Sequence, residues 1–377
     1  MQTSQQTTRI RHLLNNKSLS FIIGAGFSRN MSDRFVDWSG LLKPIVKEMY
    51  NIDDDNDVWH KIEEIGYLGI AEEYVRRKGY HEAIDVYIEQ HTPIIIRKGN
   101  SGELNETDDT EYIVMQNNEE VDIADITCHK LLFDLDVKNI FTFNYDNCLD
   151  VIGNTDEADK LLYSIRQVQT ELYFLEQIRF ESNNYNPENL STTGKTSFGQ
   201  ESIAATNSSI STTDFGTFID RLKSKFPALN ILREPFTDNT AFHDKIEDEI
   251  ARKKVERSNL QRQRESCYQL ISSAGMLSLT DRKKNIFKLH GTIRLREESE
   301  YGFDGDSHCN YIITANDYAD YPIRHEPFVD YMKISLLKGS FCIMGFSGDD
   351  PNFLSWMSWV KEVIDKNPEI KTELSQK

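Results

Sequence analysis

Cysteine, long apolar runs and basic charge are what this chain of 377 residues has least of. Its five cysteines are scattered and form no C-x-x-C pair, which argues against a disulfide framework or a zinc ribbon and favours a reducing compartment. No stretch approaches the roughly 20 apolar residues that a membrane span requires. The 43 basic and 61 acidic residues give a net charge of −18, which disfavours non-specific binding to nucleic acids or anionic membranes. We therefore expect a cytoplasmic globular protein.

Apolar strands alternate with helical segments at both ends of the chain. The predicted strands are SLSFII (18–23), VKNIFTF (137–143), NIFKLHGTI (285–293), NYIITANDY (310–318) and GSFCIMGFS (339–347). Helical periodicity occurs over 38–50, 58–77, 80–91 and 124–135. Such alternation is typical of a parallel sheet covered on both faces. The sequence therefore predicts an α/β fold with a Rossmann-like parallel sheet.

The middle of the chain breaks this rhythm. Residues 155–284 contain two long helical patterns, the second over about 240–274, separated by a segment at about 182–214 that is rich in Ser, Thr, Asn and Gly. That segment has too few apolar residues to offset its ordering entropy, so we expect a flexible loop there. The predicted organisation is an α/β domain formed from 1–154 and 285–377, with a mostly helical insertion between these parts.

Small and polar residues follow four of the predicted strands. They are the segment Gly24-Ala25-Gly26-Phe27-Ser28, the cluster Asn144-Tyr145-Asp146, the pair His290-Gly291, and the segment Gly345-Phe346-Ser347-Gly348-Asp349. In open parallel sheets, ligands bind beyond the carboxyl ends of the strands, so we expect these clusters to share one edge. Two glycines after a strand allow close approach of a pyrophosphate. The ordinary dinucleotide motif needs a third glycine, however, and that position holds Arg29.

Two polar side chains in these clusters have chemistry of their own. His290 follows its strand directly, and imidazole is the side chain whose usual pKa suits proton transfer near neutral pH. Asn144 is a weak base but can orient water or a hydroxyl group by hydrogen bonds. An alternative interpretation is that Asn144 and Asp146 only form a turn or a helix cap, where both residue types are common.

The ordered set GAGFS, TFNYD, LHG and GFSGDD resembles the motifs of the sirtuin-like NAD-binding superfamily. It is most similar to that superfamily's bacterial NAD-consuming defence effectors. The resemblance covers about 20–150 and 285–365 and omits the insertion. It implies catalytic roles for Asn144, His290 and Asp146. It also implies NAD-binding roles for Gly24, Ala25, Gly26, Phe27, Ser28, Trp38, Thr142, Gly345, Ser347 and Asp349, with Asp350 competing for the last assignment.

Departures from the pattern of sirtuin deacylases narrow the expected function. Deacylases carry two C-x-x-C pairs of a zinc module after the catalytic histidine, whereas this chain has a single cysteine there, Cys309. The segment GFSRNMSDRFVDW also differs from the Gly-Ile-Pro-Asp-Phe-Arg run of deacylases. We therefore expect no zinc and no acyl-lysine cleft, and NAD⁺ as a substrate rather than a cofactor.

Without an acyl-peptide, water becomes the natural acceptor of the ribosyl group. The resemblance then implies an NAD⁺ glycohydrolase that acts as an antiphage effector by depleting NAD⁺. It also implies that the NADase activity is restrained by homo-oligomerisation or by a HerA-type ATPase partner. The insertion could offer a surface for such contacts. The alternatives are a module that senses NAD⁺ or ADP-ribose without turnover, and a residual ADP-ribosyltransferase or deacylase.

Overall fold

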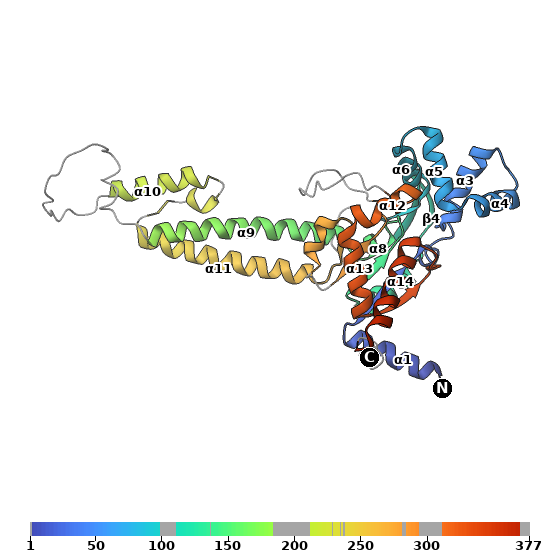
Figure 1. Cartoon of the computed structure of the whole chain (residues 1–377). Helices are drawn as coiled ribbons and strands as arrows, with labels where there is room; N and C mark the ends of the chain where they lie inside the picture. The colour runs from blue at the N-terminus through green and yellow to red at the C-terminus, as the bar shows by residue number, and fades with distance from the viewer. Residues whose placement is uncertain are drawn as a thin grey trace, which may run out of the picture. The chain divides into compact units, whose positions relative to one another are not determined.

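The computed structural model describes residues 2–98, 111–135, 137–183, 212–227, 229–233, 235–236, 238–280, 284–293 and 311–369 (Figure 1). Its internal contacts divide the chain into two compact units. Unit 1 comprises Met1–Asp159 and Cys267–Lys377, and unit 2 comprises Lys160–Ser266. Each unit has a buried apolar core of its own. Among the described residues, no helix combines the length and the apolar composition that crossing a membrane requires.

Unit 1 is built on a five-stranded sheet in which each pair of neighbouring strands is parallel. In spatial order the strands are β6 (Gln269–Ile271), β7 (Asn285–Lys288), β5 (Asn139–Thr142), β1 (Leu19–Ile23) and β8 (Ser340–Met344). The register aligns Ile23 with both Thr142 and Met344, so these three strands end level with one another. The predicted Rossmann-like α/β fold is confirmed.

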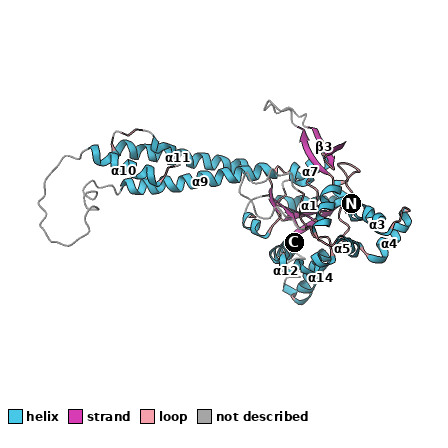
Figure 2. Cartoon of the chain, turned by 90° about the horizontal axis from the view of Figure 1, so that it is seen from above, coloured by secondary structure: helices cyan, strands magenta, loops and turns pink. Residues whose placement is uncertain are grey.

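Helices cover both faces of this sheet (Figure 2). The face that carries Ile22, Phe141 and Phe287 packs against three helices late in the chain, namely α12 (Ala315–Arg324), α13 (Glu326–Lys338) and α14 (Pro351–Lys366). The opposite face, with Ile140 and Ile286, packs against α1 (Gln2–Asn15), α7 (Thr127–Asp134) and α8 (Cys148–Ile152). Coverage of both faces explains why β5 and β7 are buried along almost their whole length.

Four further helices of unit 1 form a second core after the short helix α2 (Ala25–Ser28). They are α3 (Trp38–Tyr50), α4 (Asp55–Ile65), α5 (Tyr67–Lys78) and α6 (Glu82–His91). Aliphatic side chains at helical spacing fill this core, among them Leu42, Ile45 and Ile70. The helix predicted over 58–77 is divided at Gly66, whose φ of 79° ends α4 before α5 begins.

A small antiparallel sheet, which the sequence analysis did not predict, follows these helices. Its strands are β2 (Ile94–Lys98), β3 (Glu111–Gln116) and β4 (Glu119–Ile123). The turn between β3 and β4 is Asn117-Asn118, and both residues have positive φ, as a two-residue hairpin of type I′ requires. Asn147 attaches this sheet to the turn after β5: its Oδ1 accepts the Ile95 N–H, and its Nδ2 donates to the Ile95 carbonyl.

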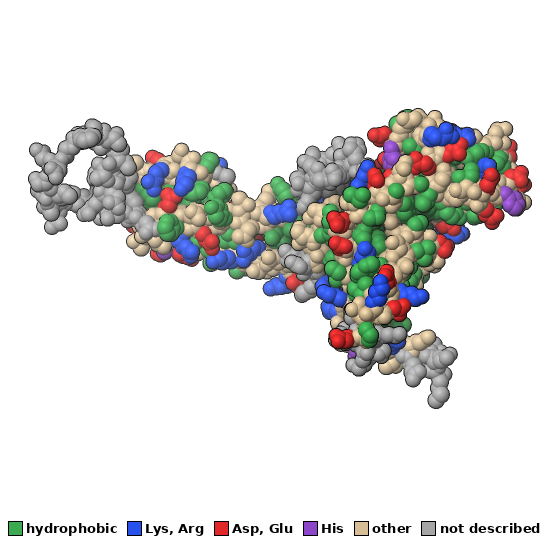
Figure 3. All heavy atoms as spheres, viewed as in Figure 1, with side chains coloured by type: hydrophobic (Ala, Val, Ile, Leu, Met, Phe, Trp, Pro, Cys, Tyr) green, Lys and Arg blue, Asp and Glu red, His purple; other side chains and the backbone are tan. Residues whose placement is uncertain are grey.

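Unit 2 is helical and has its own core. It contains most of α9 (Thr155–Asn183) together with α10 (Thr212–Lys225), η2 (Asn230–Arg233) and α11 (Asn239–Arg264). Apolar residues of α9, α10 and α11, including Ile178, Phe218 and Phe242, pack together. Acidic and basic side chains lie interspersed on the visible face of this unit (Figure 3). An example is the ion pair between Lys253 and Glu171, with 2.6 Å between Nζ and Oε2.

Three segments differ from the sequence-based expectations. The second helix ends at Arg264 rather than near 274, and Gln269–Ile271 forms β6 of the central sheet, although the insertion was expected to reach 284. The strand predicted at 310–318 is wrong, because a capping box between Thr314 and Asp317 starts helix α12 there. The predicted flexible loop falls mainly on 184–211, which lie outside the described residues.

Candidate functional site

The glycine-rich loop after β1 lies directly against the loop after β8. The backbone N–H of Gly26 donates to the carbonyl of Gly345, 2.9 Å away, and Gly24 N–H donates to the carbonyl of Met344 at 3.0 Å. Gly345 has a φ of 62°, and a Cβ there would lie 2.1 Å from the backbone nitrogen of Phe27. Glycine is therefore required at Gly345 both for its backbone conformation and for the close approach of the two loops.

Ser28 joins this loop to the turn that follows β5. The Asn144 side-chain Nδ2 donates to Ser28 Oγ at 3.1 Å, and Ser28 Oγ donates to Asp146 Oδ2 at 2.9 Å. The other carboxylate oxygen of Asp146 accepts the backbone N–H of Cys148 at 3.1 Å, as in an Asx-turn. Thr142 is fully buried beneath the turn, and its Oγ1 accepts the Asn144 backbone N–H at 3.1 Å. These bonds fix the amide of Asn144 beside Ser28.

The remaining residues of this turn connect it to other parts of unit 1. The Tyr145 hydroxyl donates to the carbonyl of Ile312 at 2.8 Å, and the Tyr145 carbonyl accepts the N–H of Ile293 at the same distance. Complete burial raises the pKa of Tyr145 well above its usual value, so the hydroxyl stays protonated. Asn147 binds β2, as described above. The polar cluster after β5 therefore serves as a structural junction as well as a strand end.

Lys288, the last residue of β7, places a buried cation under the same turn. Its side chain is fully buried, and Nζ donates to the carbonyl of Asn144 at 3.4 Å and to the carbonyl of Asp146. The Asp150 carboxylate, 3.6 Å from Nζ, supplies the opposite charge and also accepts the Thr292 hydroxyl at 2.9 Å. Lys288 therefore holds the backbone of the two residues that carry the predicted amide and carboxylate.

His290 lies two residues beyond Lys288 and is completely buried. Its Nδ1 is 3.4 Å from the Tyr318 hydroxyl, and its Nε2 is 3.7 Å from Asp350 Oδ2. Nε2 has no hydrogen-bond partner among the described residues. Burial lowers the pKa of His290 to about 4, although the Asp350 charge partly opposes that effect. The imidazole is therefore neutral at pH 7 and able to accept a proton.

The two carboxylates after β8 occupy different environments. Asp350 caps helix α14, since its Oδ1 accepts the N–H of Phe353 at 2.9 Å, and its Oδ2 accepts the Tyr318 hydroxyl at 2.6 Å. Asp349 is exposed, and its backbone N–H donates to Ser347 Oγ at 3.4 Å. Asp349 and Asp350 competed for one NAD-binding role in the sequence analysis. Asp350 is the carboxylate beside His290, whereas Asp349 and Ser347 lie at the surface of the loop.

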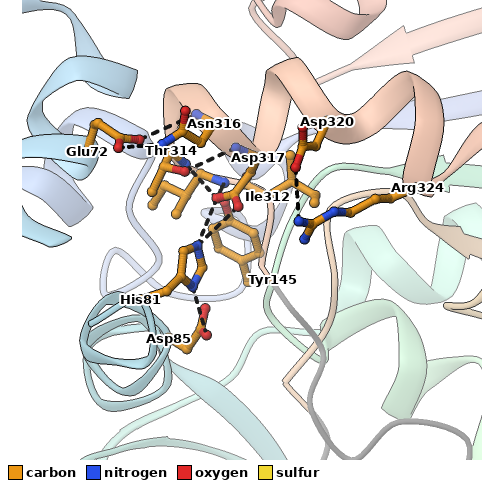
Figure 4. Close-up of polar contacts among 11 residues, drawn as sticks. Glu72, His81, Asp85, Tyr145, Ile312, Thr314, Asn316, Asp317, Asp320 and Arg324 are labelled. Carbon is orange, nitrogen blue, oxygen red and sulfur yellow. Dashed lines mark hydrogen bonds and ion pairs between the residues drawn. The ribbon is translucent and has the colours of Figure 1, made fainter. Parts of the chain in front are cut away.

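Helix α12, which carries Tyr318, is fixed at its first turn by the polar contacts that Figure 4 draws. Asp317 accepts the backbone N–H of Thr314 at 2.8 Å and contacts His81 Nε2 at 3.0 Å. His81 Nδ1 lies 3.3 Å from Asp85 Oδ2. Burial lowers the pKa of His81, but the nearby charges of Asp317 and Asp85 raise it by more than burial lowers it. The pKa of His81 is therefore raised overall. The helix start is therefore anchored to α6, which determines where Tyr318 lies.

Trp38, the aromatic residue expected near the ligand, begins helix α3. Its ring meets the ring of Tyr318 edge to face, with centroids 6.1 Å apart, and contacts Tyr67 in the same manner at 6.4 Å. Through Tyr318, Trp38 is thus one aromatic ring away from His290. The geometry places Trp38 at the side of the candidate site that α3 and α12 form.

Sequence reasoning missed Lys288 and Tyr318, and it named Asp350 only as a competitor of Asp349 for an NAD-binding role, not as the carboxylate beside His290. The Asp350-Pro351 pair carried a signal, because an N-cap aspartate followed by proline is typical of a helix start. Tyr318 lay in the segment that was expected to be a strand, so its direction could not be inferred. Lysine is rarely buried, and nothing in the run NIFKLHG shows that Lys288 is.

The described residues contain no group of three or more His, Cys, Asp and Glu side chains arranged to hold a metal ion. The segment after His290 in which deacylases carry their zinc ligands lies at 294–310, outside the described residues. The expectation that this chain has no zinc module therefore stays a prediction.

Comparison with known proteins gives one positive result. Residues 238–372 match the family model of the SIR2-like domain. This range contains His290, Tyr318 and the loop after β8, but it contains neither β1 nor β5. No curated protein matches the sequence. The parallel sheet and the SIR2-like match together support the sirtuin-like superfamily for this chain and indicate a function related to NAD.

Proposed function

We propose that this chain is an NAD⁺ glycohydrolase, which cleaves the nicotinamide–ribose bond of NAD⁺ and releases nicotinamide and ADP-ribose. The observation that carries the proposal is the placement, at one edge of a parallel sheet, of Asn144 beside Ser28 and of a buried His290 whose Nε2 has no partner among the described residues. The SIR2-like match over His290 supports NAD⁺ as the ligand.

The loops at this edge would bind the dinucleotide. Residues 24–28 would bind the pyrophosphate through their backbone N–H groups, and their glycines also allow this loop to pack closely against Gly345. Gly345, Ser347 and Asp349 would bind the adenosine half. Trp38 would face the site beside Tyr318, and Thr142 would act indirectly by holding the Asn144 turn. NAD⁺ is consumed as a substrate in this proposal, and no zinc is invoked.

The chemistry requires no acid at the leaving group, because nicotinamide departs as a neutral pyridine. The bond to C1′ breaks with oxocarbenium character, and the Asn144 amide, oriented by Ser28, positions the attacking water. His290, neutral at pH 7, accepts the proton of that water or of a ribose hydroxyl. Asp146 contributes negative charge near the ribose and holds Ser28 in place.

The test is chromatography of NAD⁺ incubated with the full chain. Wild type should yield nicotinamide and ADP-ribose, and Asn144→Ala and His290→Gln should each lower the rate by about 10² to 10⁴. His60→Gln is the matched control, because that histidine of α4 has a side chain that is 79% exposed. NAD⁺ that binds tightly and stays intact would instead identify a sensor module. Products that form only with an acceptor peptide or protein would identify a transferase or deacylase.

The same proposal includes a biological role and partners. We propose that the cytoplasmic protein depletes cellular NAD⁺ during phage infection and is restrained by homo-oligomerisation or by a HerA-type ATPase. Cells that express wild type should lose NAD⁺ and resist phage, whereas cells that express Asn144→Ala should do neither. Turnover by the purified chain that is unaffected by the ATPase and by protein concentration would count against this restraint.

A further inference from the structure

The two ring nitrogens of His290 face different groups from two different helices. Nδ1 faces the hydroxyl of Tyr318 on α12 at 3.4 Å, and Nε2 faces Oδ2 of Asp350, at the start of α14, at 3.7 Å. The Tyr318 hydroxyl also lies 2.6 Å from that same Oδ2. One tyrosine hydroxyl therefore bridges a carboxylate and an imidazole.

Counting protons determines which nitrogen of His290 carries one. A tyrosine hydroxyl has a single proton, and the short contact with Asp350 Oδ2 uses it as a charge-assisted hydrogen bond. The hydroxyl oxygen can then only accept from His290, so Nδ1 must be the protonated nitrogen. Nε2 keeps its lone pair, which agrees with its lack of a hydrogen-bond partner among the described residues.

We propose that Tyr318 and Asp350 are positioning residues that select the Nδ1–H tautomer of His290 and so make Nε2 the atom that accepts the proton. The inference rests on the proposed glycohydrolase function. In the step, an O–H proton of the attacking water moves to Nε2 while the water oxygen bonds to C1′. The electrons of the C1′–N bond leave with nicotinamide. The resulting imidazolium lies opposite the Asp350 carboxylate and later releases its proton to solvent.

The charges around His290 agree with this role. Asp350 favours the imidazolium, and Asp317, at the first turn of α12, acts in the same direction, whereas His325 at the end of that helix opposes it. The titratable side chains whose rings meet His290 are Tyr318 and Tyr321, with centroids 5.3 and 5.7 Å away. Asp350 is thus the carboxylate that lies directly beside the imidazole, and its charge is the one most able to stabilise the product of proton transfer.

Replacing Asp350 with asparagine should invert the tautomer. Asparagine keeps the helix cap, since its Oδ1 can still accept the Phe353 N–H. Its amide NH₂ would then donate to the Tyr318 oxygen, which would turn the hydroxyl proton toward His290 Nδ1. The imidazole proton would move to Nε2 and block the proposed base. Tyr318→Phe removes the bridge without adding a donor, so it should give a mixture of both tautomers.

The experiment is nitrogen NMR of the full chain labelled on its nine histidines, with His290→Gln used to identify the His290 signals. Protonated and unprotonated ring nitrogens have well-separated shifts, so the tautomer is read directly and without turnover. Wild type should show Nδ1–H, Asp350→Asn should show Nε2–H, and Tyr318→Phe should show both. The inference is overturned if wild type carries its proton on Nε2, or if Asp350→Asn leaves the signals unchanged.

Steady-state kinetics then separate positioning from folding. We expect kcat to fall about 10- to 100-fold in Tyr318→Phe and more in Asp350→Asn, with KM within about twofold of wild type. Tyr321→Phe is the matched control on the same helix, since its hydroxyl binds the Leu289 carbonyl at 2.9 Å. Asp54→Asn alters the N-cap of α4 in the same way as Asp350→Asn alters that of α14. Both controls should keep the wild-type tautomer and kcat.

The two readouts fail independently. A wild-type protein without NAD⁺ turnover but with Nδ1–H on His290 would overturn the glycohydrolase and leave the tautomer assignment standing. Normal turnover with a wrong tautomer, or with kcat unchanged in Asp350→Asn, would overturn the positioning role alone.

Discussion

The polar groups on the two sides of the candidate site are satisfied to different degrees. On one side, Lys288 donates to two carbonyls and faces Asp150, and Asp146 accepts bonds through both carboxylate oxygens. On the other side, His290 Nε2 has no partner among the described residues, although the side chain is just as buried. The first arrangement is what a rigid support requires, and the second leaves a lone pair available for chemistry.

This difference indicates that Lys288 contributes mainly to stability and His290 mainly to activity. A buried ion pair contributes little net stability but is costly to break, because removing one charge leaves the other buried without its counter-charge. A buried imidazole nitrogen without a hydrogen-bond partner is energetically costly, and such a cost at a site of this kind is often associated with function. Lys288 and His290, two residues apart, should therefore respond differently to substitution.

Removal of the Lys288 cation is expected to have the largest effect on stability. In Lys288→Met, Asp150 would stay buried without its cation and two carbonyls would lose their donor, so the free energy of unfolding should fall by about 3 to 5 kcal/mol. Denaturant unfolding monitored by tryptophan fluorescence suits this test, because all four tryptophans belong to unit 1. Lys98→Met, in an exposed pair with Glu120, is the control and should change stability by less than about 1 kcal/mol. Equal effects of the two variants would contradict the supporting role of Lys288.

The contact between the glycine loops should be the next most sensitive feature. Gly345→Ala combines left-handed strain with a Cβ only 2.1 Å from the Phe27 backbone nitrogen, so it should cost about 2 to 4 kcal/mol and weaken NAD⁺ binding. Gly348 also has a positive φ, of 83°, but a Cβ there meets nothing within 4 Å. Gly348→Ala should therefore cost only about 1 kcal/mol. Calorimetric NAD⁺ titration and unfolding of both variants would show whether close approach or strain dominates.

The sequence reveals the part of this site that follows from strand adjacency. Ser28 and Asn144 lie shortly after the ends of neighbouring parallel strands, so their proximity can be inferred once the strands are recognised. The small sheet was missed even though its Asn117-Asn118 turn is a hairpin signal. Tyr318 could not be placed, because Ile312 and Ile313 favour a strand locally whereas the cap at Thr314 starts a helix. The capping pair Thr314 and Asp317, three residues apart, overrode the strand propensity there.

Acidification should weaken unit 1 through its buried histidines. Burial lowers the pKa of both His290 and His129 to about 4, so between the usual value of 6.5 and about 4 the unfolded chain binds more protons than the folded one. Each histidine should therefore remove about 2 kcal/mol of stability as the pH falls from 7 to 5. His129→Leu should reduce that pH dependence by about half of the combined effect. If the unfolding midpoint of His129→Leu depends on pH in the same way as that of wild type, His129 is not buried in its neutral form.

His81 should show the opposite pH dependence, with the smallest effect of the set. Both of its nitrogens face carboxylates, Asp317 and Asp85, which raise its pKa in the folded state. The stabilisation is therefore fully present below pH 6.5 and is lost as the pH rises through the raised folded value. Because the side chain is 35% exposed, solvent screening should keep the contribution under about 1 kcal/mol. His81→Ala should thus lower the unfolding midpoint more at pH 6 than at pH 9.

A double variant tests whether the carboxylates cause this dependence. In an Asp85→Asn and Asp317→Asn background, His81→Ala should have the same small effect at both pH values, because no charge remains to favour the imidazolium. If His81→Ala is instead more damaging at pH 9 in the parent chain, His81 is held neutral in the fold, as His290 is. The contrast between His81, whose pKa is raised, and His290, whose pKa is lowered, would then disappear.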